Sequence, residues 1–173
     1  MDYTCHYNSP LGGITMASDG KSLTGLWFDG QKYFADSLDS DYLEKKLDIF
    51  NTTTKWLDIY FQGIIPDFTP PLNMKTTDFR KTVWNIMLKI PYGKTMTYGE
   101  IANILALEKG ISKMSAQAVG SAVGHNSISI IIPCHRVVGT SGSLAGYSGG
   151  IDKKVKLLKL EKANIDKFFV PKI

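Results

Sequence analysis

Three prolines near the middle of the chain most strongly constrain how it can fold. Pro66, Pro70 and Pro71 lie in the segment IIPDFTPPLNMKTT, residues 64–77. Proline lacks a backbone N–H and disfavours helix in the residue before it, so this segment is typical of an extended connector. We predict a domain boundary here, with domains at residues 1–73 and 74–173. A chain of 173 residues is long enough for two small cores.

The first domain is predicted to contain strands followed by helices. The stretch GGITMASDGKSLTGLWF has short apolar segments separated by Asp19-Gly20, which is a hairpin signal. Next, YLEKKLDIF and TTTKWLDIYFQG carry apolar residues at helical spacing. Threonines are available to cap the second of these helices, and Gly63 to end it.

The second domain is predicted to be mostly helical. TDFRKTVWNIMLKIPYG has one apolar stripe and ends at Pro91 and Gly93. Thr97 followed by Glu100 is a capping box that starts a helix in TYGEIANILA. The small-residue helix AQAVGSAVGHN follows after a connection, and the pair suggests a helix-turn-helix. The run ISIII is predicted to be a buried strand or extended segment, and a last helix begins near Asp152. The fold class is therefore α/β (α+β).

Charge is unevenly distributed between the two halves. Residues 1–75 hold 6 Lys+Arg against 10 Asp+Glu, whereas residues 76–173 hold 14 against 6. A basic second half is typical of proteins that meet a polyanion such as nucleic acid, although a solvated lysine face on the last helix is the simpler alternative. No apolar run approaches the roughly 18 residues that a membrane span needs.

The stretch IIIPCHRVV places a thiol, an imidazole and a guanidinium side by side. Cys134 is one of only two cysteines, and His135 follows it directly. A thiol reacts as its thiolate, and a histidine can take its proton directly or through water. In extended chain neighbouring residues point to opposite faces, so the pair requires a turn at Cys134, which Pro133 favours. The alternative is that Cys134 is only a small buried apolar residue.

Glu161 is a candidate to orient the imidazole. The apolar stripe of the last helix runs through Ile151, Val155 and Leu158, and Glu161 falls at its inward edge. A carboxylate there needs a partner to offset its desolvation, and His135 would give a Cys–His–Glu relay. Arg136 could contact phosphate, but we expect it in an interior or interdomain ion pair.

Several motifs together resemble one family. IPCHRVV is similar to the active-site signature of the O6-alkylguanine-DNA alkyltransferases, also called methylated-DNA–protein-cysteine methyltransferases. The similarity extends to AQAVGSAVGHN, GSLAGYSGG, KLLKLE and IPYGKTMTYGEIA. SPLGGITMASDG and WLDIYFQG resemble the family's first, ribonuclease H-like domain. The resemblance covers nearly the whole chain.

The resemblance implies direct repair of O6-alkylguanine in duplex DNA, and less efficiently of O4-alkylthymine. Cys134 would accept the alkyl group as a thioether, so each molecule would act once. His135 would be its base through a water, Glu161 would orient His135, and Asn126 would be the hinge asparagine. No cofactor is implied, because the thiol itself is the second substrate.

The resemblance also assigns the contacts to DNA. Tyr98 would help rotate the nucleotide out of the duplex, Tyr147 would form a pocket wall, the backbone of Ser148 would meet the guanine oxygen, and the carbonyls of Cys134 and Val137 would meet its amine. Flipping the base costs a few kcal/mol. The remaining DNA-binding residues are expected at the start of the small-residue helix, which would enter the minor groove: Ser115, Ala116, Gln117, Ala118 and Ser121.

Two positions depart from the family pattern. Gln117 stands where many members have an arginine that fills the gap left by the flipped base, so a filling residue without charge is expected. The common Asn-Pro is here Asn126-Ser127, which would soften the hinge.

The remaining expectations concern compartment, metal and assembly. Two distant cysteines and no secretion signal favour a reducing, cytoplasmic location. Cys5-His6 would need further ligands to hold the structural zinc of some relatives, and Thr24 stands where a second cysteine might be expected, so no metal is predicted. We expect a monomer that binds double-stranded DNA and no membrane. Two alternatives are a lesion-binding relative that does not repair, which would lack the cysteine, and a cysteine hydrolase of small amides or esters, which would turn over.

Overall fold

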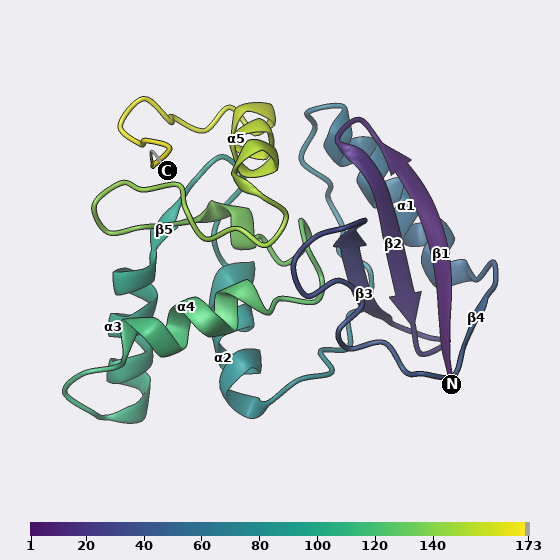
Figure 1. Cartoon of the computed structure of the whole chain (residues 1–173), viewed down its shortest axis with the longest axis horizontal. Coiled ribbons are helices and arrows are strands. Elements are labelled where there is room, and N and C mark those ends of the chain that lie inside the picture. The colour runs from purple at the N-terminus through teal and green to yellow at the C-terminus, as the bar shows by residue number, and fades with distance from the viewer. Residues whose placement is uncertain (172–173) are drawn as a thin grey trace. The chain divides into compact units, whose positions relative to one another are not determined.

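The computed structural model describes residues 1–171 and divides into two compact units. The first unit comprises residues 1–76 together with 127–131, and the second comprises residues 77–126 and the chain from residue 132 onward (Figure 1).

The first unit is built on a four-stranded sheet. Its strands are β1 (Asp2–Ser9), β2 (Gly12–Ser18), β3 (Leu23–Phe28) and β4 (Tyr42–Glu44), in the spatial order β3-β2-β1-β4. The hairpin predicted at Asp19-Gly20 joins β2 to β3 and is confirmed. The first three strands are antiparallel, and β4 pairs with β1 in parallel.

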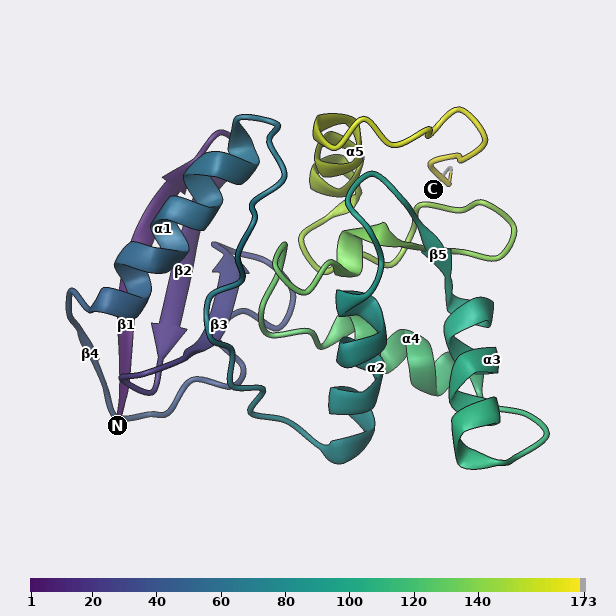
Figure 2. The same cartoon turned by 180° about the vertical axis from the view of Figure 1, so that it is seen from behind.

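One helix, α1 (Asp48–Phe61), packs on this sheet, as Figure 2 shows from behind. The prediction of a helix over YLEKKLDIF was wrong in its first part, because Tyr42–Glu44 instead completes the edge of the sheet beside β1. The expected threonine cap was also wrong. Thr52 and Thr53 lie inside α1, where each hydroxyl donates to the carbonyl four residues earlier. The helix does end before Gly63, which adopts a left-handed φ of 78°.

Residues 127–131 belong to the first unit although they follow its last residue by some fifty positions. The carbonyl of Ser127 accepts from Leu26 N–H at 2.8 Å, and Ser129 N–H donates to Leu26 O at 2.9 Å. Ile128 thereby forms a single bridge with Leu26 rather than a strand. The prediction of a buried segment is correct for Ile128, Ile130 and Ile131. A continuous strand is excluded, because Ile130 turns the backbone with φ 70°.

The second unit is mainly helical. It contains α2 (Asp78–Leu88), α3 (Tyr98–Lys109), α4 (Ala116–Gly124) and α5 (Ile151–Leu160), close to the predicted helices. Both halves of the predicted capping box are present: the side chain of Thr97 accepts from Glu100 N–H, and that of Glu100 accepts from Thr97 N–H. α3 and α4 pack against each other and are joined by residues 110–115, and the indole of Trp84 on α2 donates to Ala122 O on α4 at 2.8 Å.

A short parallel ladder brings two distant segments of this unit together. β5 (Met96–Thr97) pairs with β6 (Val137–Val138) in the register Met96↔Val137. Between α4 and β6 the chain makes a 3₁₀ turn, η1 (Cys134–Arg136), and after β6 residues 139–150 lead to α5. Val138, Leu144 and Leu158 form a buried cluster that anchors this loop to α5. Among residues 1–171, none of the helices combines the length and apolar character of a membrane span.

Candidate active site

Cys134 lies at the first position of the 3₁₀ turn, directly after Pro133. The turn expected from the proline is present, since Cys134 N–H donates to Ile132 O at 2.8 Å. The Cys134 side chain is 4% exposed. The amide of Asn126 donates to Ile132 O at 2.8 Å and to Cys134 Sγ at 3.2 Å, so one side chain holds both the turn and the sulfur.

His135 and Glu161 are in contact and completely buried. Nε2 of His135 lies 2.6 Å from Oε2 of Glu161, which caps the C-terminus of α5. Because a carboxylate only accepts, we assign the imidazole proton to Nε2. Nδ1 then carries the lone pair, and this buried nitrogen has no hydrogen-bond partner among the described residues. The imidazole is therefore oriented with its basic nitrogen unused.

Arg136 shares the same carboxylate. Its Nε donates to Glu161 Oε1 at 2.8 Å, one terminal nitrogen donates to Oε2 at 3.1 Å, and the other donates to Ile90 O at 2.7 Å. Gly93 N–H adds a further bond to Glu161 Oε1 at 3.0 Å. The open question about Arg136 is thus decided in favour of an interior ion pair. The sequence did not reveal that Glu161 would serve two consecutive residues.

Burial and neighbouring charges determine the protonation states of this cluster. Burial alone would raise the pKa of Glu161, but hydrogen bonds and charge from His135 and Arg136 outweigh it and lower that pKa well below its usual range. Burial lowers the pKa of His135, although Glu161 acts in the opposite direction. Since Arg136 is always charged, it suffices to keep Glu161 ionised, and His135 is neutral at rest.

The thiol of Cys134 is protonated at rest because it is buried. Burial raises the pKa of Cys134, while the hydrogen bond from Asn126 and the charge of Lys154 act against this. Tyr98 also remains protonated, because burial, and then the charge of Cys134, raise its pKa to about 12. The resting site therefore holds a neutral thiol on Cys134 and a neutral imidazole on the next residue, His135.

The β5–β6 ladder places Tyr98 in the same region as the cysteine turn. Tyr98 is the first residue of α3, directly after Thr97, which pairs with Val138. Its hydroxyl lies so close to Gly146 that a Cβ at that glycine would be 2.8 Å from it. Gly146 also has a φ of 97°, so only glycine suits this position.

The loop between β6 and α5 holds the other predicted substrate-binding residues. Tyr147 is 7% exposed, and its ring meets that of His135 edge-on with centroids 6.4 Å apart. The hydroxyl of Ser148 donates to the carbonyl of Gly124, the last residue of α4. Val137 is fully buried. The loop thus joins the cysteine turn to the end of α4.

The predicted DNA-binding residues lie at the N-cap and in the first two turns of α4, and most of them are exposed. Ser115 caps the helix by accepting from Ala118 N–H at 3.1 Å. Gly120 and Gly124 face open space, since a Cβ on either would meet no atom within 4 Å. Apart from Gln117, the exposed surface of this helix therefore carries only small side chains. The predicted residues on it are Ser115, Ala116, Gln117 and Ser121, which are exposed, and Ala118, which is half-buried.

Lys154 was missed by the sequence analysis. This lysine of α5 is completely buried, and its Nζ donates to Val137 O at 2.6 Å. A signal was available, because Lys154 lies three and four residues before Leu157 and Leu158 and seven before Glu161. That spacing is the inward face of a helix.

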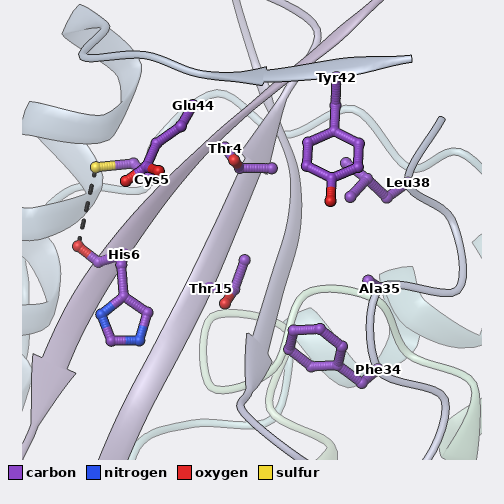
Figure 3. Close-up of a pocket in the computed structure, with 9 residues that line it drawn as sticks. All are labelled: Thr4, Cys5, His6, Thr15, Phe34, Ala35, Leu38, Tyr42 and Glu44. Atoms are coloured by element: carbon purple, nitrogen blue, oxygen red, sulfur yellow. Dashed lines mark hydrogen bonds between the residues drawn. The ribbon is translucent and has the colours of Figure 1, made fainter. Parts of the chain in front are cut away.

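A separate pocket lies in the first unit, between the sheet and the segment after β3 (Figure 3). Cys5 and His6 are among its lining residues. The Cys5 thiol donates a hydrogen bond to the carbonyl of His6, and the His6 imidazole points away from the sulfur. His6 instead pairs with Asp29 at 2.7 Å. Among residues 1–171, no group of three or more His, Cys, Asp or Glu side chains is placed to hold a metal ion.

Comparison with known proteins identifies the family to which the chain belongs. Residues 78–163 match the family model described as 6-O-methylguanine DNA methyltransferase, DNA binding domain, and residues 3–74 match its ribonuclease-like domain. Methylated-DNA–protein-cysteine methyltransferase of Mycobacterium tuberculosis is 42% identical over 161 residues, covering 91% of this chain and 93% of the relative. The Methanosarcina acetivorans protein of the same name is 40% identical over 92% of this chain and 97% of its own.

Solved structures extend the similarity to three dimensions. The crystal structure of Mycobacterium tuberculosis O6-methylguanine methyltransferase has a TM-score of 0.79 and 41% identity, over 94% of this chain and 93% of that one. The Mycobacterium tuberculosis OGT solved in complex with DNA has a TM-score of 0.78 and 38% identity, over 96% and 97%. With a buried cysteine in an IPCHRVV turn and this similarity over nearly its full length, the chain belongs to the methylated-DNA–protein-cysteine methyltransferase family.

Proposed function

We propose that this protein repairs duplex DNA by transferring the alkyl group of O6-alkylguanine, and less efficiently of O4-alkylthymine, to Sγ of Cys134. The observation that carries this proposal is a buried thiol followed in the chain by a neutral imidazole whose Nε2 bonds Glu161 and whose Nδ1 has no hydrogen-bond partner among the described residues. The family relationship supplies the substrate class.

The first step is removal of the thiol proton. His135 Nδ1 accepts it through a water, and Glu161, already ionised, stabilises the imidazolium that forms. Asn126 donates to the sulfur and stabilises the thiolate. In this step Glu161 orients the base and stays ionised.

In the second step the thiolate attacks the alkyl carbon. A sulfur–carbon bond forms, the carbon–O6 bond breaks, and its electron pair remains on the guanine, which takes up the proton that His135 accepted from Cys134. The product is a restored guanine and a thioether on Cys134. The sulfur–carbon bond of a thioether is stable, because breaking it by attack on the alkyl carbon would have to expel a thiolate, so each molecule acts once.

DNA would be bound by the second unit, through α4. The open surface at Gly120 and Gly124 lets the backbone approach a minor groove closely. Gln117, which is exposed near the start of α4, would fill the gap left by the flipped base. The flipped guanine would lie among Tyr98, Val137, Tyr147 and Ser148.

We assign residues 74–173 as the DNA-binding and alkyl-acceptor domain and residues 1–73 as the ribonuclease H-like domain. The protein would act as a monomer in the cytoplasm. An acceptor thiol has to stay reduced before use, and both cysteines are free.

Intact-protein mass spectrometry after mixing with a duplex that carries one O6-methylguanine tests the proposal. One CH₂ per molecule should be gained on the peptide containing Cys134, and none with undamaged duplex. Cys134→Ala should abolish the gain and keep lesion binding. An unchanged mass with retained binding would instead indicate a lesion-binding protein, and multiple turnover of an ester or amide substrate would indicate a hydrolase.

A further inference from the structure

A buried positive charge lies on the inward face of α5 without a carboxylate partner. Lys154 is 0% exposed, and its Nζ donates to two carbonyl oxygens, Val137 O at 2.6 Å and Ala145 O at 3.5 Å. Among residues 1–171 no Asp or Glu forms an ion pair with it. The nearby Glu161 carboxylate is occupied by His135 and Arg136.

Burying the Lys154 ammonium without an anionic partner costs free energy. Two carbonyl dipoles compensate only part of the hydration that an ammonium loses, and buried charges in proteins are normally paired. Burial accordingly lowers the pKa of Lys154 to about 8, and the only opposing influence is the charge of Cys134. A nonpolar side chain at position 154 would avoid this desolvation cost, so stability alone does not account for a lysine there.

The titratable groups around the thiol leave one candidate for its counter-ion. Tyr98 is neutral and can only become negative, so it cannot balance a thiolate. His135 is neutral until it accepts the proton of Cys134, and the guanidinium of Arg136 is paired with the carboxylate of Glu161. Lys154, from the helix that packs on the 3₁₀ turn, is the cation that remains.

We propose that Lys154 is the counter-ion of the Cys134 thiolate, a positioning residue that stores a buried positive charge for the moment when the acceptor ionises. The inference rests on the proposed alkyl transfer and deepens it. By bonding Val137 O, Lys154 also holds in place a carbonyl that the proposed function assigns to the guanine amine.

A consequence concerns the spent protein. Alkylation converts the sulfur into a neutral thioether, and the charge that Lys154 balances can no longer form. At a pH at which the free thiol would ionise, the ammonium is then left without its counter-ion, so Lys154 should release its proton more readily.

Titration of the thiol tests the ion pair without any DNA. The rate of Cys134 alkylation by iodoacetamide is measured against pH in a Cys5→Ser background, so failure of DNA repair would not affect the result. Lys154→Met should raise the pKa of Cys134 by about one unit or more, which slows alkylation at pH 7 about tenfold. Lys154→Arg, which keeps the charge, should restore most of the rate. Lys156→Met, an exposed lysine of the same helix, should leave the profile unchanged.

The second measurement uses the unmutated lysine and so remains decisive even if Lys154→Met fails to fold. In protein with ¹³C-labelled lysine side chains, the pKa of Lys154 is followed by NMR before and after Cys134 is capped with neutral iodoacetamide. Capping should lower it. An unchanged pKa of Lys154, or an unchanged thiol profile in a folded Lys154→Met protein, would overturn the proposal.

Discussion

At the scale of single residues, the site depends on one carboxylate that satisfies two partners. Glu161 accepts from His135 and doubly from Arg136, and all three are buried or nearly so. Replacing the carboxylate leaves a buried guanidinium without its anion, which is more costly than never having had the pair. The Glu161 carboxylate therefore both orients His135 and stabilises the second unit.

Glu161→Gln should destabilise the protein by about 3–5 kcal/mol, the usual range for breaking a buried ion pair. Urea unfolding followed by circular dichroism measures this. Glu108→Gln, the same change at an exposed position of α3, should stay within about 0.5 kcal/mol of the parent. Equal stability of the two variants would contradict the role of Glu161 in the cluster.

The pH dependence of alkyl transfer should follow His135. Burial lowers its pKa, so the neutral base is fully present above about pH 6.5, and the rate should decline only as the pH falls below that value. Glu161 raises the pKa of His135, so Glu161→Gln should move this acid limb to lower pH. The same variant should also reduce the plateau rate by about 100-fold. Single-turnover kinetics from pH 5 to 8 test both effects, and an acid limb that moves upward would refute the assignment.

Stability should decline over the same acid range. With its folded-state pKa below the unfolded value, His135 contributes stability that is present above about pH 6.5 and lost as the pH falls. Glu161, whose pKa is also depressed, adds a second loss below about pH 4.5.

At the scale of elements, two very short strands and one helix cap bring residues that are distant in sequence close together. The two-residue strands β5 and β6 align Tyr98 with the segment after the cysteine turn, and the Thr97–Glu100 capping box fixes where α3 begins. The cap therefore also determines where the tyrosine side chain emerges.

Thr97→Ala should lower the free energy of unfolding by about 1 kcal/mol, since the N–H of Glu100 loses its acceptor. Alkyl transfer should slow as well, because Tyr98 is the next residue. Thr82→Ala removes a threonine whose hydroxyl only bonds its own helix, so it is the matched control and should change transfer little. Unfolding and single-turnover rates are compared for both, and equal transfer rates would argue against the positioning of Tyr98 by the cap.

The start of α4 offers a test of the unusual Gln117. Gln117→Arg adds a cation to an exposed position of the proposed DNA surface, so binding to undamaged duplex should tighten. If the new side chain reaches a phosphate, the slope of log affinity against log salt should steepen by about 1. Gln62→Arg, the same substitution in the first unit, controls for net charge. Identical salt slopes for the two variants would place α4 away from the DNA.

At the scale of the whole molecule, one segment from the second half of the sequence belongs to the first unit. Residues 127–131 leave the second unit and complete the first by bonding Leu26 of β3 on both sides. Ile128 and Ile130 add buried apolar side chains to the first unit from beyond the connector.

Ile128→Ala should therefore destabilise the first unit, by about 2–5 kcal/mol if the site does not collapse. Hydrogen exchange should show the loss at the amide of Leu26, although the substitution lies only six residues before the acceptor cysteine. Ile111→Ala, at a residue 45% exposed, is the control. Unchanged protection at Leu26 would mean that this segment contributes little to the first unit.

Local sequence patterns were enough to predict the helices of the second unit and the turn at Cys134. These depend on local physics: caps, apolar spacing, and the restriction that Pro133 places on the chain before Cys134. The contact of Glu161 with His135 could also be anticipated, because an inward-facing carboxylate must find a partner.

By contrast, which groups share a partner and which segments complete a sheet became clear only from the folded structure. Tyr42–Glu44 has helical spacing but becomes a strand because β1 offers an unpaired edge, and residues 127–131 turn after a single bridge. The double use of Glu161 by His135 and Arg136, and the burial of Lys154, depend on residues brought together from distant positions. Sequence spacing describes one element at a time, whereas burial and charge pairing depend on all the elements that meet at a point.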